Sequence, residues 1–254
     1  PRPQFGLPQM NARFASLLAA LSLALPAPAV EAQEAPAIDS ATPSARVTVA
    51  PLRLVLDGQR MHETLRVINP SDRPIGIQVR AFAWTQADGE DVYAPTTDVL
   101  VSPAIVVIEP GETQFFRVQR RALPAAGERR YRVAIDQLPD PELAQNGMAM
   151  TRIRFTIPLF VDRATAAPAQ LDWSVKGDTL RVANRGQQSA RMVSLALSNG
   201  VNAPVDIQGA SLHYVHGGSW LEWKLPAGCP TGPLTLQARI EGDTHRVQVP
   251  ATCS

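Results

Sequence analysis

Alternation of apolar and polar residues is the main signal along this chain, and it is strongest between Met148 and Val161. Successive side chains of a strand point to opposite faces, so one face would carry an apolar row of Ile153, Phe155, Ile157, Leu159 and Val161. Pro158 cannot donate a ladder hydrogen bond, which predicts a sheet edge at that point. A long edge strand with an apolar row invites another chain to pair with it. The stretch therefore indicates strand pairing with a partner, and an ordinary covered core strand is the alternative that the pattern leaves open.

Other short β-branched runs, separated by Gly, Pro, Asn and Asp, precede this stretch, and no long helical periodicity is present. With the long strand they make about seven strands in roughly 115 residues, the number expected of an immunoglobulin-like sandwich. A change of parity at Ala50-Pro51 predicts a kink or bulge in the first run. The predicted strands are 46–56, 63–68, 75–84, 102–108, 113–119, 131–138 and 148–161.

A second group of strands follows a short linker. Residues 162–168 (DRATAAP) are charged, then small, and end in proline, which is typical of an interdomain linker. The sequence therefore predicts an all-β protein with a first domain at 45–161 and a second, smaller β domain at 169–254. The strands expected in the second domain are 171–175, 179–183, 190–197, 207–215, 219–225, 234–240 and 245–249.

The N-terminal region has the pattern of a secretory signal peptide. We interpret residues 1–9 as an upstream extension and Met10 as the start, followed by a basic Arg13 and an apolar run at 17–25. Small residues favour cleavage after Ala32. The apolar run is shorter than the about 20 residues of a spanning helix. We therefore expect an exported protein with a loose tail at 33–44 and no membrane insertion after cleavage.

Composition indicates which class of partner is not expected to bind and whether the cysteines form a disulfide. The formal net charge of +1 leaves no basic domain, which argues against a nucleic-acid partner. Cys229 and Cys253 are the two cysteines, and an even count in an exported protein indicates one disulfide. Closing a loop of that size contributes roughly 3 kcal/mol in the chain-entropy model. Two free buried thiols are the alternative.

No pattern typical of an enzyme stands out. His213 and His216 form H-x-x-H, but this spacing in a strand points them to opposite faces, and a metal site needs three or four converging ligands. A G-x-S-x-G nucleophile turn and a glycine-rich phosphate loop are both missing from the sequence. We therefore expect no catalysis, no cofactor and no metal.

Arginines in strand positions are the remaining candidates for chemistry. Arg53 interrupts an apolar run, Arg152 and Arg154 follow the polar face of the long strand, and Arg132 belongs to the strand before it. Solvent-facing charges that guard an edge against aggregation are one explanation. The other is that a cation beside a paired edge anchors a peptide carboxylate through charge-assisted hydrogen bonds.

The order and spacing of several motifs resemble the PapD-like family of periplasmic chaperones in chaperone–usher pilus assembly. No single motif is decisive, but the resemblance covers essentially all of the mature chain. The motifs are RVTVAPLRLVLDG at 46–58, Asn69-Pro70, PGETQ at 110–114, FRV at 116–118, Leu123-Pro124, YRVAIDQLP at 131–139, IPLFV at 157–161, LRVAN at 180–184 and GGSW at 217–220.

The resemblance implies a fold and a function. It implies two immunoglobulin-like domains in an L-shaped arrangement with a cleft between them. It also implies a periplasmic chaperone that lends its seventh strand to incomplete pilus subunits and delivers them to an outer-membrane usher.

The resemblance also implies roles for particular residues. Arg53 matches the family's first cleft cation, which binds the subunit's C-terminal carboxylate. Glu128 matches a member of a buried interdomain ion network, for which Arg163 is the expected partner. The expected donor residues are Ile153, Phe155 and Ile157, extended by Met148 and Met150 if a bulge shifts the parity.

One position departs from the family pattern. The family's second cleft cation is a lysine late in the seventh strand, and the corresponding residue here is Pro158, or Thr156 on a shifted alignment. Neither binds a carboxylate as an ion. Either another base, Arg152, Arg154 or Arg132, works with Arg53, or the chain belongs to a divergent branch, which the Ile-Pro pair suggests is that of archaic pili. A secreted β-sandwich adhesion or structural protein without strand donation is the alternative function.

Overall fold

The computed structural model describes residues 47–121, 123–139, 152–209 and 212–253. The expected signal peptide, the tail at 33–44, Met148 and Met150 lie outside these ranges. The described chain is nearly all β, and its one helical element is the 3-10 turn η1 (Arg163–Thr165), which falls in the predicted linker. Within these ranges, no helix has the length and apolar character needed to cross a membrane.

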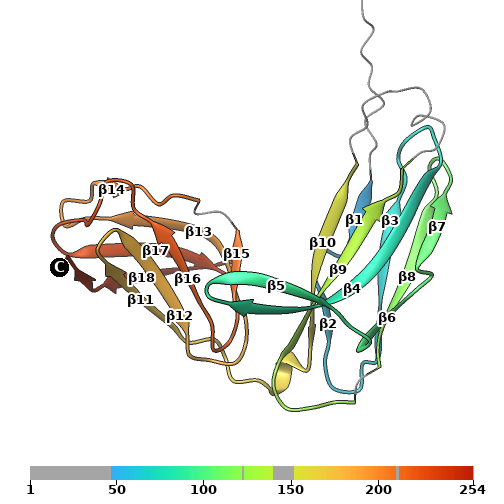
Figure 1. Ribbon diagram of the computed structural model, residues 1–254, viewed down its shortest axis with the longest axis horizontal. Coiled ribbons are helices and arrows are strands. Elements are labelled where there is room, and N and C mark those ends of the chain that lie inside the picture. The colour runs from blue at the N-terminus through green and yellow to red at the C-terminus, as the bar shows by residue number, and fades with distance from the viewer. Residues whose placement is uncertain (1–46, 122, 140–151, 210–211, 254) are drawn as a thin grey trace, which may run out of the picture. The chain divides into compact units, whose positions relative to one another are not determined.

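The first sandwich contains two sheets around one core (Figure 1). One sheet has the order β1-β3-β8-β6 and the other the order β2-β10-β9-β4-β5, with β7 also paired to β4. The pairings are antiparallel except that β10 and β2 run parallel. The strands are β1 (Thr48–Ala50), β2 (Leu54–Leu56), β3 (His62–Ile68), β4 (Ile75–Ala87), β5 (Glu90–Pro95), β6 (Val99–Ser102), β7 (Ile105–Ile108), β8 (Thr113–Arg120), β9 (Arg129–Gln137) and β10 (Arg154–Val161).

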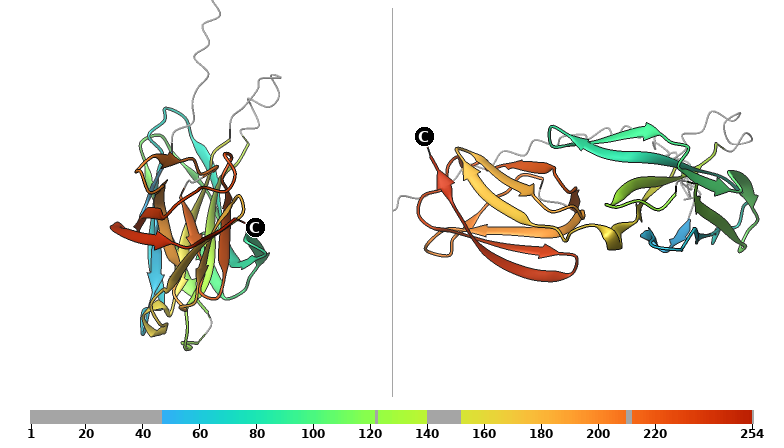
Figure 2. Two further views of the ribbon diagram at one scale, coloured as in Figure 1. Left: turned by 90° about the vertical axis from the view of Figure 1, so that its left-hand side faces the viewer. Right: turned by 90° about the horizontal axis from the view of Figure 1, so that it is seen from below.

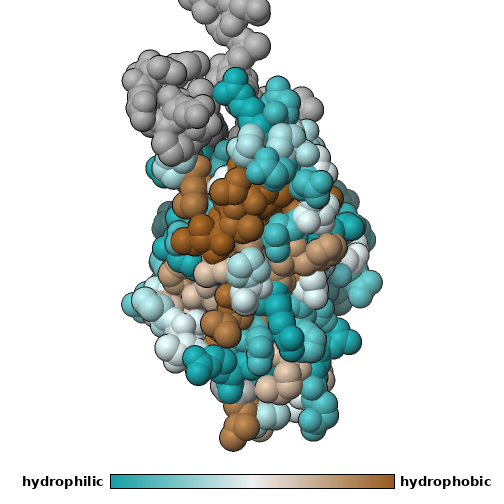
Figure 3. Space-filling model, turned by 90° about the vertical axis from the view of Figure 1, so that its right-hand side faces the viewer, coloured by the Kyte–Doolittle hydropathy of each residue, from teal (hydrophilic) through white to brown (hydrophobic). Residues whose placement is uncertain are grey.

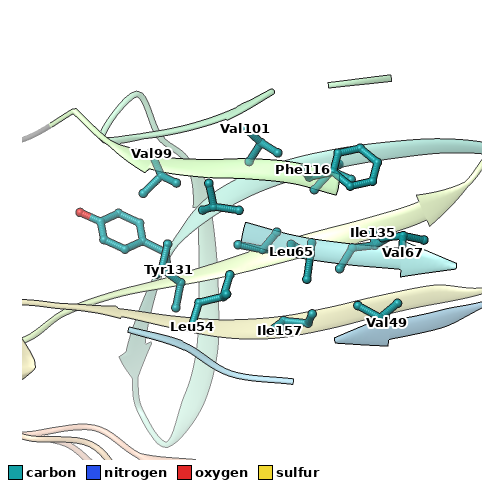
Figure 4. Packing of buried hydrophobic residues seen from close by; sticks show 14 of the residues in the cluster. Val49, Leu54, Leu65, Val67, Val99, Val101, Phe116, Tyr131, Ile135 and Ile157 are labelled. Carbon is teal, nitrogen blue, oxygen red and sulfur yellow. The ribbon is translucent and has the colours of Figure 1, made fainter. Parts of the chain in front are cut away.

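The period of two seen in the sequence explains this core. In β3 and β8 the buried residues alternate with exposed or half-buried ones, so that Leu65 and Val67 from one strand share the core with Phe116 from the next (Figure 4). Val118 of β8 belongs to the same core. Each such side chain, when fully buried, stabilises the fold by roughly 1.5–3 kcal/mol. The apolar row of a strand therefore decides which of its faces turns inward.

Two predicted strands are each divided at a proline. The chain leaves the β1 sheet at the cis Ala50-Pro51 bond and joins the other sheet as β2, which confirms the predicted kink. The prediction of one strand at 102–108 was wrong. The chain changes sheet at Ser102-Pro103, so Ser102 ends β6 in one sheet and β7 follows in the other. Strand β5 was not predicted, because all its residues are exposed and show no alternation.

The second sandwich also has two sheets (Figures 1 and 2). Their orders are β16-β12-β11-β19 and β14-β13-β17-β18, with β15 paired to β13. The disulfide between Cys229 and Cys253 is present, with Cα atoms 5.7 Å apart, as predicted. The strands are β11 (Leu171–Lys176), β12 (Thr179–Asn184), β13 (Ala190–Ser198), β14 (Pro204–Val205), β15 (His213–Val215), β16 (Trp220–Lys224), β17 (Leu234–Ile240), β18 (Asp243–Val249) and β19 (Ala251–Thr252).

One expected strand of this domain is much shorter than predicted. Among the described residues of the predicted strand 207–215, only 213–215 form a strand, which pairs with β13 at Ala190–Met192. His216 therefore lies just beyond the strand, where its side chain is buried, whereas His213 is exposed. The two histidines of this H-x-x-H therefore differ in burial, and only His213 belongs to the strand.

Candidate functional site

Strand β10 has an open edge over its first half. β9 pairs with all of β10, from Arg154 to Val161, but β2 pairs only with Leu159–Val161 on the other side. Within the described chain, residues 154–158 thus have a neighbour on one side only. The predicted sheet edge at Pro158 is confirmed, and the free side of this segment is where another strand can add.

The expected donor residues lie at different depths along this edge. Ile153 precedes the strand and is half-buried, and its carbonyl oxygen accepts a hydrogen bond of 3.0 Å from the Gln137 amide. Phe155 is half-buried and packs against the margin of the core. Ile157 is 2% exposed inside the core (Figure 4). In this conformation Ile157 is therefore not accessible to a partner, because its own domain already covers it.

Two of the candidate arginines, Arg152 and Arg154, lie just before β10 and at its start. Arg154 donates to Asp136, which also accepts a hydrogen bond of 2.7 Å from Arg80. Burial acts to raise the pKa of Asp136, but the hydrogen bonds from Arg80 and Arg154 outweigh it and the pKa lies below its usual value. Arg152 is exposed just before β10. The Arg154 charge is therefore already matched on the sheet surface.

Arg132 lies beside Pro158, one of the two positions at which the resemblance places the family's lysine. In the β9–β10 register it stands directly opposite Pro158, so the two side chains share one face of the sheet. Its guanidinium carbon lies 3.7 Å from the ring centroid of Trp84 and 5.5 Å from that of Tyr214. Its Nε is buried without a hydrogen-bond partner, and no carboxylate of the described chain forms a salt bridge with it. Arg132 is thus a cation held by aromatic faces.

Arg53 lies at the entry to β2, beside the same aromatic groups. Its guanidinium carbon is 4.9 Å from the ring centroid of Phe160. Its Nη1 donates a hydrogen bond of 2.7 Å to Glu241, and about a third of the Arg53 side chain is exposed. The structure therefore brings Arg53 and Arg132 to the margins of one aromatic cluster, which we define as Trp84, Phe160, Tyr214 and His216.

This aromatic cluster is buried and joins residues distant in sequence. The Trp84 ring centroid lies 5.3 Å from that of Tyr214 and 4.2 Å from that of His216, both edge-on. The side chain of Gln86 adds hydrogen bonds of 2.7 Å to the Tyr214 carbonyl and 2.8 Å from the His216 amide. These contacts tie β4 of the first sandwich to the end of β15 in the second.

His216 is held in its neutral form. Neither ring nitrogen has a hydrogen-bond partner in the described structure. Burial, followed by the positive charge of Arg130, lowers the pKa of His216 to about 3. Protonating this ring inside the cluster would place an uncompensated charge next to the two cations Arg130 and Arg132.

Glu128 and Arg163 form the centre of an ion chain. The Glu128 side chain is fully buried, pairs with Arg163, and accepts a hydrogen bond of 3.0 Å from Arg130. The amide and hydroxyl of Ser189 also donate to it, at 2.8 Å and 2.6 Å. Arg163 continues to Glu241 at 3.4 Å, and Glu241 continues to Arg53. An unbroken series of charges thus links Glu128 to Arg53.

Several of these residues were missed by the sequence analysis. Trp84 ends an alternating run and could have been suspected from its size, but Tyr214, His216 and Glu241 carry no local signal that points to Arg53 or Arg132. The fully buried pair of Arg120 and Asp162 was missed for the same reason. Asp162 accepts from Arg120 at 2.7 Å and 2.9 Å and closes the end of β10.

A patch of exposed apolar side chains lies on β7, away from β10 in the same sheet, and on β8 of the other sheet. β7 and β10 are separated by β4 and β9, so they stand at different ends of the strand order. Ile105 and Val107 on β7 are 57% and 60% exposed, and Phe115 on β8 is 57% exposed. Figure 3 shows a broad apolar surface on the side of the molecule that carries these strands. Such patches mark interaction sites more often than chance exposure does.

Comparison with known proteins gives one family match. Residues 46–166 match the family model of the pili and flagellar-assembly chaperone PapD N-terminal domain. No curated protein matches the chain.

Solved structures share the fold over most of the chain. A structure of the CsuC–CsuE chaperone–tip adhesion subunit complex, from archaic Csu pili of Acinetobacter baumannii, has a TM-score of 0.64 at 20% identity and covers 82% of this chain and 100% of its own. The E. coli chaperone DraB has a TM-score of 0.57 at 18% identity, covering 80% and 98%. A Salmonella enterica complex of the SafA pilin with the SafB chaperone has 0.57 at 21%, covering 80% and 95%. At these identities the likeness establishes the fold.

Proposed function

We propose that the chain is a pilus-assembly chaperone of the PapD-like family, whose N-terminal domain model matches residues 46–166, and that it holds pilus subunits in the periplasm by adding β10 to them. The observation that carries the proposal is the open edge of β10 beside two cations, Arg53 and Arg132. It acts by binding, without catalysis or a cofactor. The low identity to the solved chaperones is in keeping with a divergent branch.

The open edge supplies both direction and apolar contact. A subunit strand that pairs with residues 154–158 gains backbone hydrogen bonds that fix its register. Ile153 and Phe155 are the side chains that we propose to enter the subunit, and each contributes roughly 1.5–3 kcal/mol when fully buried. Ile157 stays in the core of its own domain and is left out of the donor row.

The cations supply an anchor for the subunit's terminal carboxylate. We assign Arg132 as the second cation, because its place opposite Pro158 puts a charge where the family has a lysine. Charge-assisted hydrogen bonds from a guanidinium are stronger than neutral ones and can be bidentate. Arg53 is the first cation, and the ion chain through Glu128 and Arg163 keeps the two sandwiches in place around it.

Delivery to an usher requires a second surface that stays free while a subunit is bound. The exposed Ile105, Val107 and Phe115 meet this requirement, because β7 is separated from β10 by β4 and β9, and Phe115 lies on β8 of the other sheet. We propose that the usher contacts this apolar patch.

The test is co-purification from a periplasm that expresses the chain with the subunits encoded beside its gene. The variants are Ile153→Asp with Phe155→Asp, Arg53→Ala and Arg132→Ala. The double variant should lose the subunit, and each arginine variant should retain clearly less of it. Thr156→Asp is the matched control for a charge on the same strand, because Thr156 is exposed on the opposite face, and Arg60→Ala is the control for loss of an exposed arginine.

The results test the role of each arginine and strand donation itself. Loss of the subunit with Arg53→Ala but not with Arg132→Ala would remove Arg132 from the anchor. Equal recovery of a subunit by every variant, or no recovery even by the wild type, would refute strand donation and favour an adhesion or structural protein.

A further inference from the structure

Glu241 is a carboxylate fixed at the tip of a hairpin. β17 and β18 pair up to Ile240 and Asp243, which leaves Glu241 and Gly242 as a two-residue turn. Both residues have a positive φ, 54° and 116°, the left-handed region used by tight hairpin turns. The amide of Glu241 also donates a hydrogen bond of 2.9 Å to the Arg191 carbonyl. The turn therefore holds this side chain in a defined position.

The two oxygens of Glu241 have separate partners. Oε2 accepts a hydrogen bond of 2.7 Å from Arg53 Nη1. Oε1 accepts longer hydrogen bonds, of 3.4 Å from Arg163 Nη2 and 3.3 Å from the Arg191 amide. Arg53 is thus occupied by one oxygen, and the other oxygen is held independently of it.

We propose that Glu241 occupies the carboxylate position on Arg53 in the free chain and that the terminal carboxylate of a bound subunit displaces it. The inference rests on the proposed function. Glu241 presents to Arg53 the same group that a subunit's C-terminus presents.

Displacement leaves no charge without a partner. After Oε2 is released, Oε1 keeps its contacts with Arg163 and the Arg191 amide. Arg53 exchanges one carboxylate for another, which avoids the cost of leaving a partly buried charge unpaired. The side chains of both Arg53 and Glu241 are 32% exposed, so that an incoming carboxylate can reach the pair. A ligand without a terminal carboxylate takes no part in this exchange, so competition from Glu241 weakens binding only of ligands that end in a carboxylate.

The experiment measures peptide binding to the full mature chain. The probe is a fluorescently labelled peptide of alternating valine and threonine with a free C-terminal carboxylate, compared with the same peptide as its C-terminal amide. Glu241→Gln should bind the carboxylate peptide about threefold to tenfold more tightly than the wild type, the size of effect expected for loss of one partly exposed ion pair. Binding of the amide peptide should not change.

Two further variants separate local from general effects. Glu222→Gln is the matched control, because it removes a carboxylate paired to Arg181 at 3.2 Å in the same sandwich, and it should not change binding. Glu241→Asp keeps the charge and suits a left-handed turn, but its carboxylate is one methylene shorter. It should also bind the carboxylate peptide more tightly, which keeps the test valid if Glu241→Gln folds poorly.

Different results would refute the exchange at Glu241 and the role of Arg53 as a carboxylate anchor. If the wild type prefers the carboxylate peptide, and Arg53→Gln removes that preference while neither Glu241 variant strengthens it, only the exchange is refuted. If no protein prefers the carboxylate over the amide, Arg53 is not a carboxylate anchor and both proposals are overturned.

Discussion

Acid should destabilise this protein through His216, well above the pH at which carboxylates titrate. The pKa of His216 is about 3 in the folded chain, whereas an unfolded histidine has a pKa of about 6.5. Folding therefore favours the neutral ring. This contribution is fully present above pH 6.5 and is lost progressively as the pH falls toward the folded value.

The size of the effect follows from the two pKa values. Between pH 7.5 and pH 4.5 the unfolded chain takes up one proton that the folded chain does not, so the free energy of unfolding should fall by about 2.5 kcal/mol. Burial makes the folded pKa low, and the nearby Arg130 and Arg132 lower it further, while Asp91 acts to raise it. The pKa values of Asp136 and Asp162 are already lowered in the folded state, so their titration falls below this window.

The perturbation is His216→Phe, which keeps an aromatic ring against Trp84 and removes both unpaired ring nitrogens. At pH 7.5 it should be less stable than the wild type by about 1–3 kcal/mol, because phenylalanine is larger than histidine and the site is packed. Between pH 7.5 and pH 4.5 its free energy of unfolding should fall by about 2.5 kcal/mol less than that of the wild type.

The assay is urea unfolding, followed by tryptophan fluorescence, at several pH values across this window. His245→Phe is the control, because His245 is exposed on β18 and its replacement should leave the wild-type slope unchanged. If the wild type and His216→Phe lose stability in parallel as the pH falls, His216 is not held neutral by the fold and the reasoning is refuted.

Three further perturbations test the ion chain, a close backbone contact and the disulfide. Glu128→Gln should lower the free energy of unfolding by about 3 kcal/mol in urea, because Arg130 and Arg163 lose a buried partner. The exposed Glu222→Gln should cost less than about 1 kcal/mol, and equal losses would contradict a special role for Glu128. Gly186→Ala should lower the melting temperature by several degrees, since its Cβ would lie 2.1 Å from the Pro168 carbonyl oxygen, and an unchanged melting temperature would rule this clash out. Reduction of Cys229–Cys253, which closes a separation of 24 residues, should cost about 3 kcal/mol, an effect absent from Cys229→Ser with Cys253→Ser.

Local periodicity was enough to predict the class of fold and much of the core. Alternation in β3, β8 and β9 decided which side chains turn inward, because a strand buries whichever face is apolar. The kink at Ala50-Pro51, the disulfide and the edge at Pro158 follow from what single residues can and cannot do. The family resemblance could be recognised from the order of the motifs, because each motif is a turn or a strand and the spacing between them follows from the fold.

The register and the path of the chain decided the rest. Alternation gives Ile157 the same face as Phe155, but only the packed structure shows that Ile157 lies inside its own core. Arg132 gained its place opposite Pro158 from the register of β9 on β10, which the sequence of neither strand encodes alone. Arg53 meets Glu241 across 188 residues, and Gln86 meets Tyr214 across 128. A period of two is a property of neighbouring residues, whereas these contacts form only when whole sheets pack.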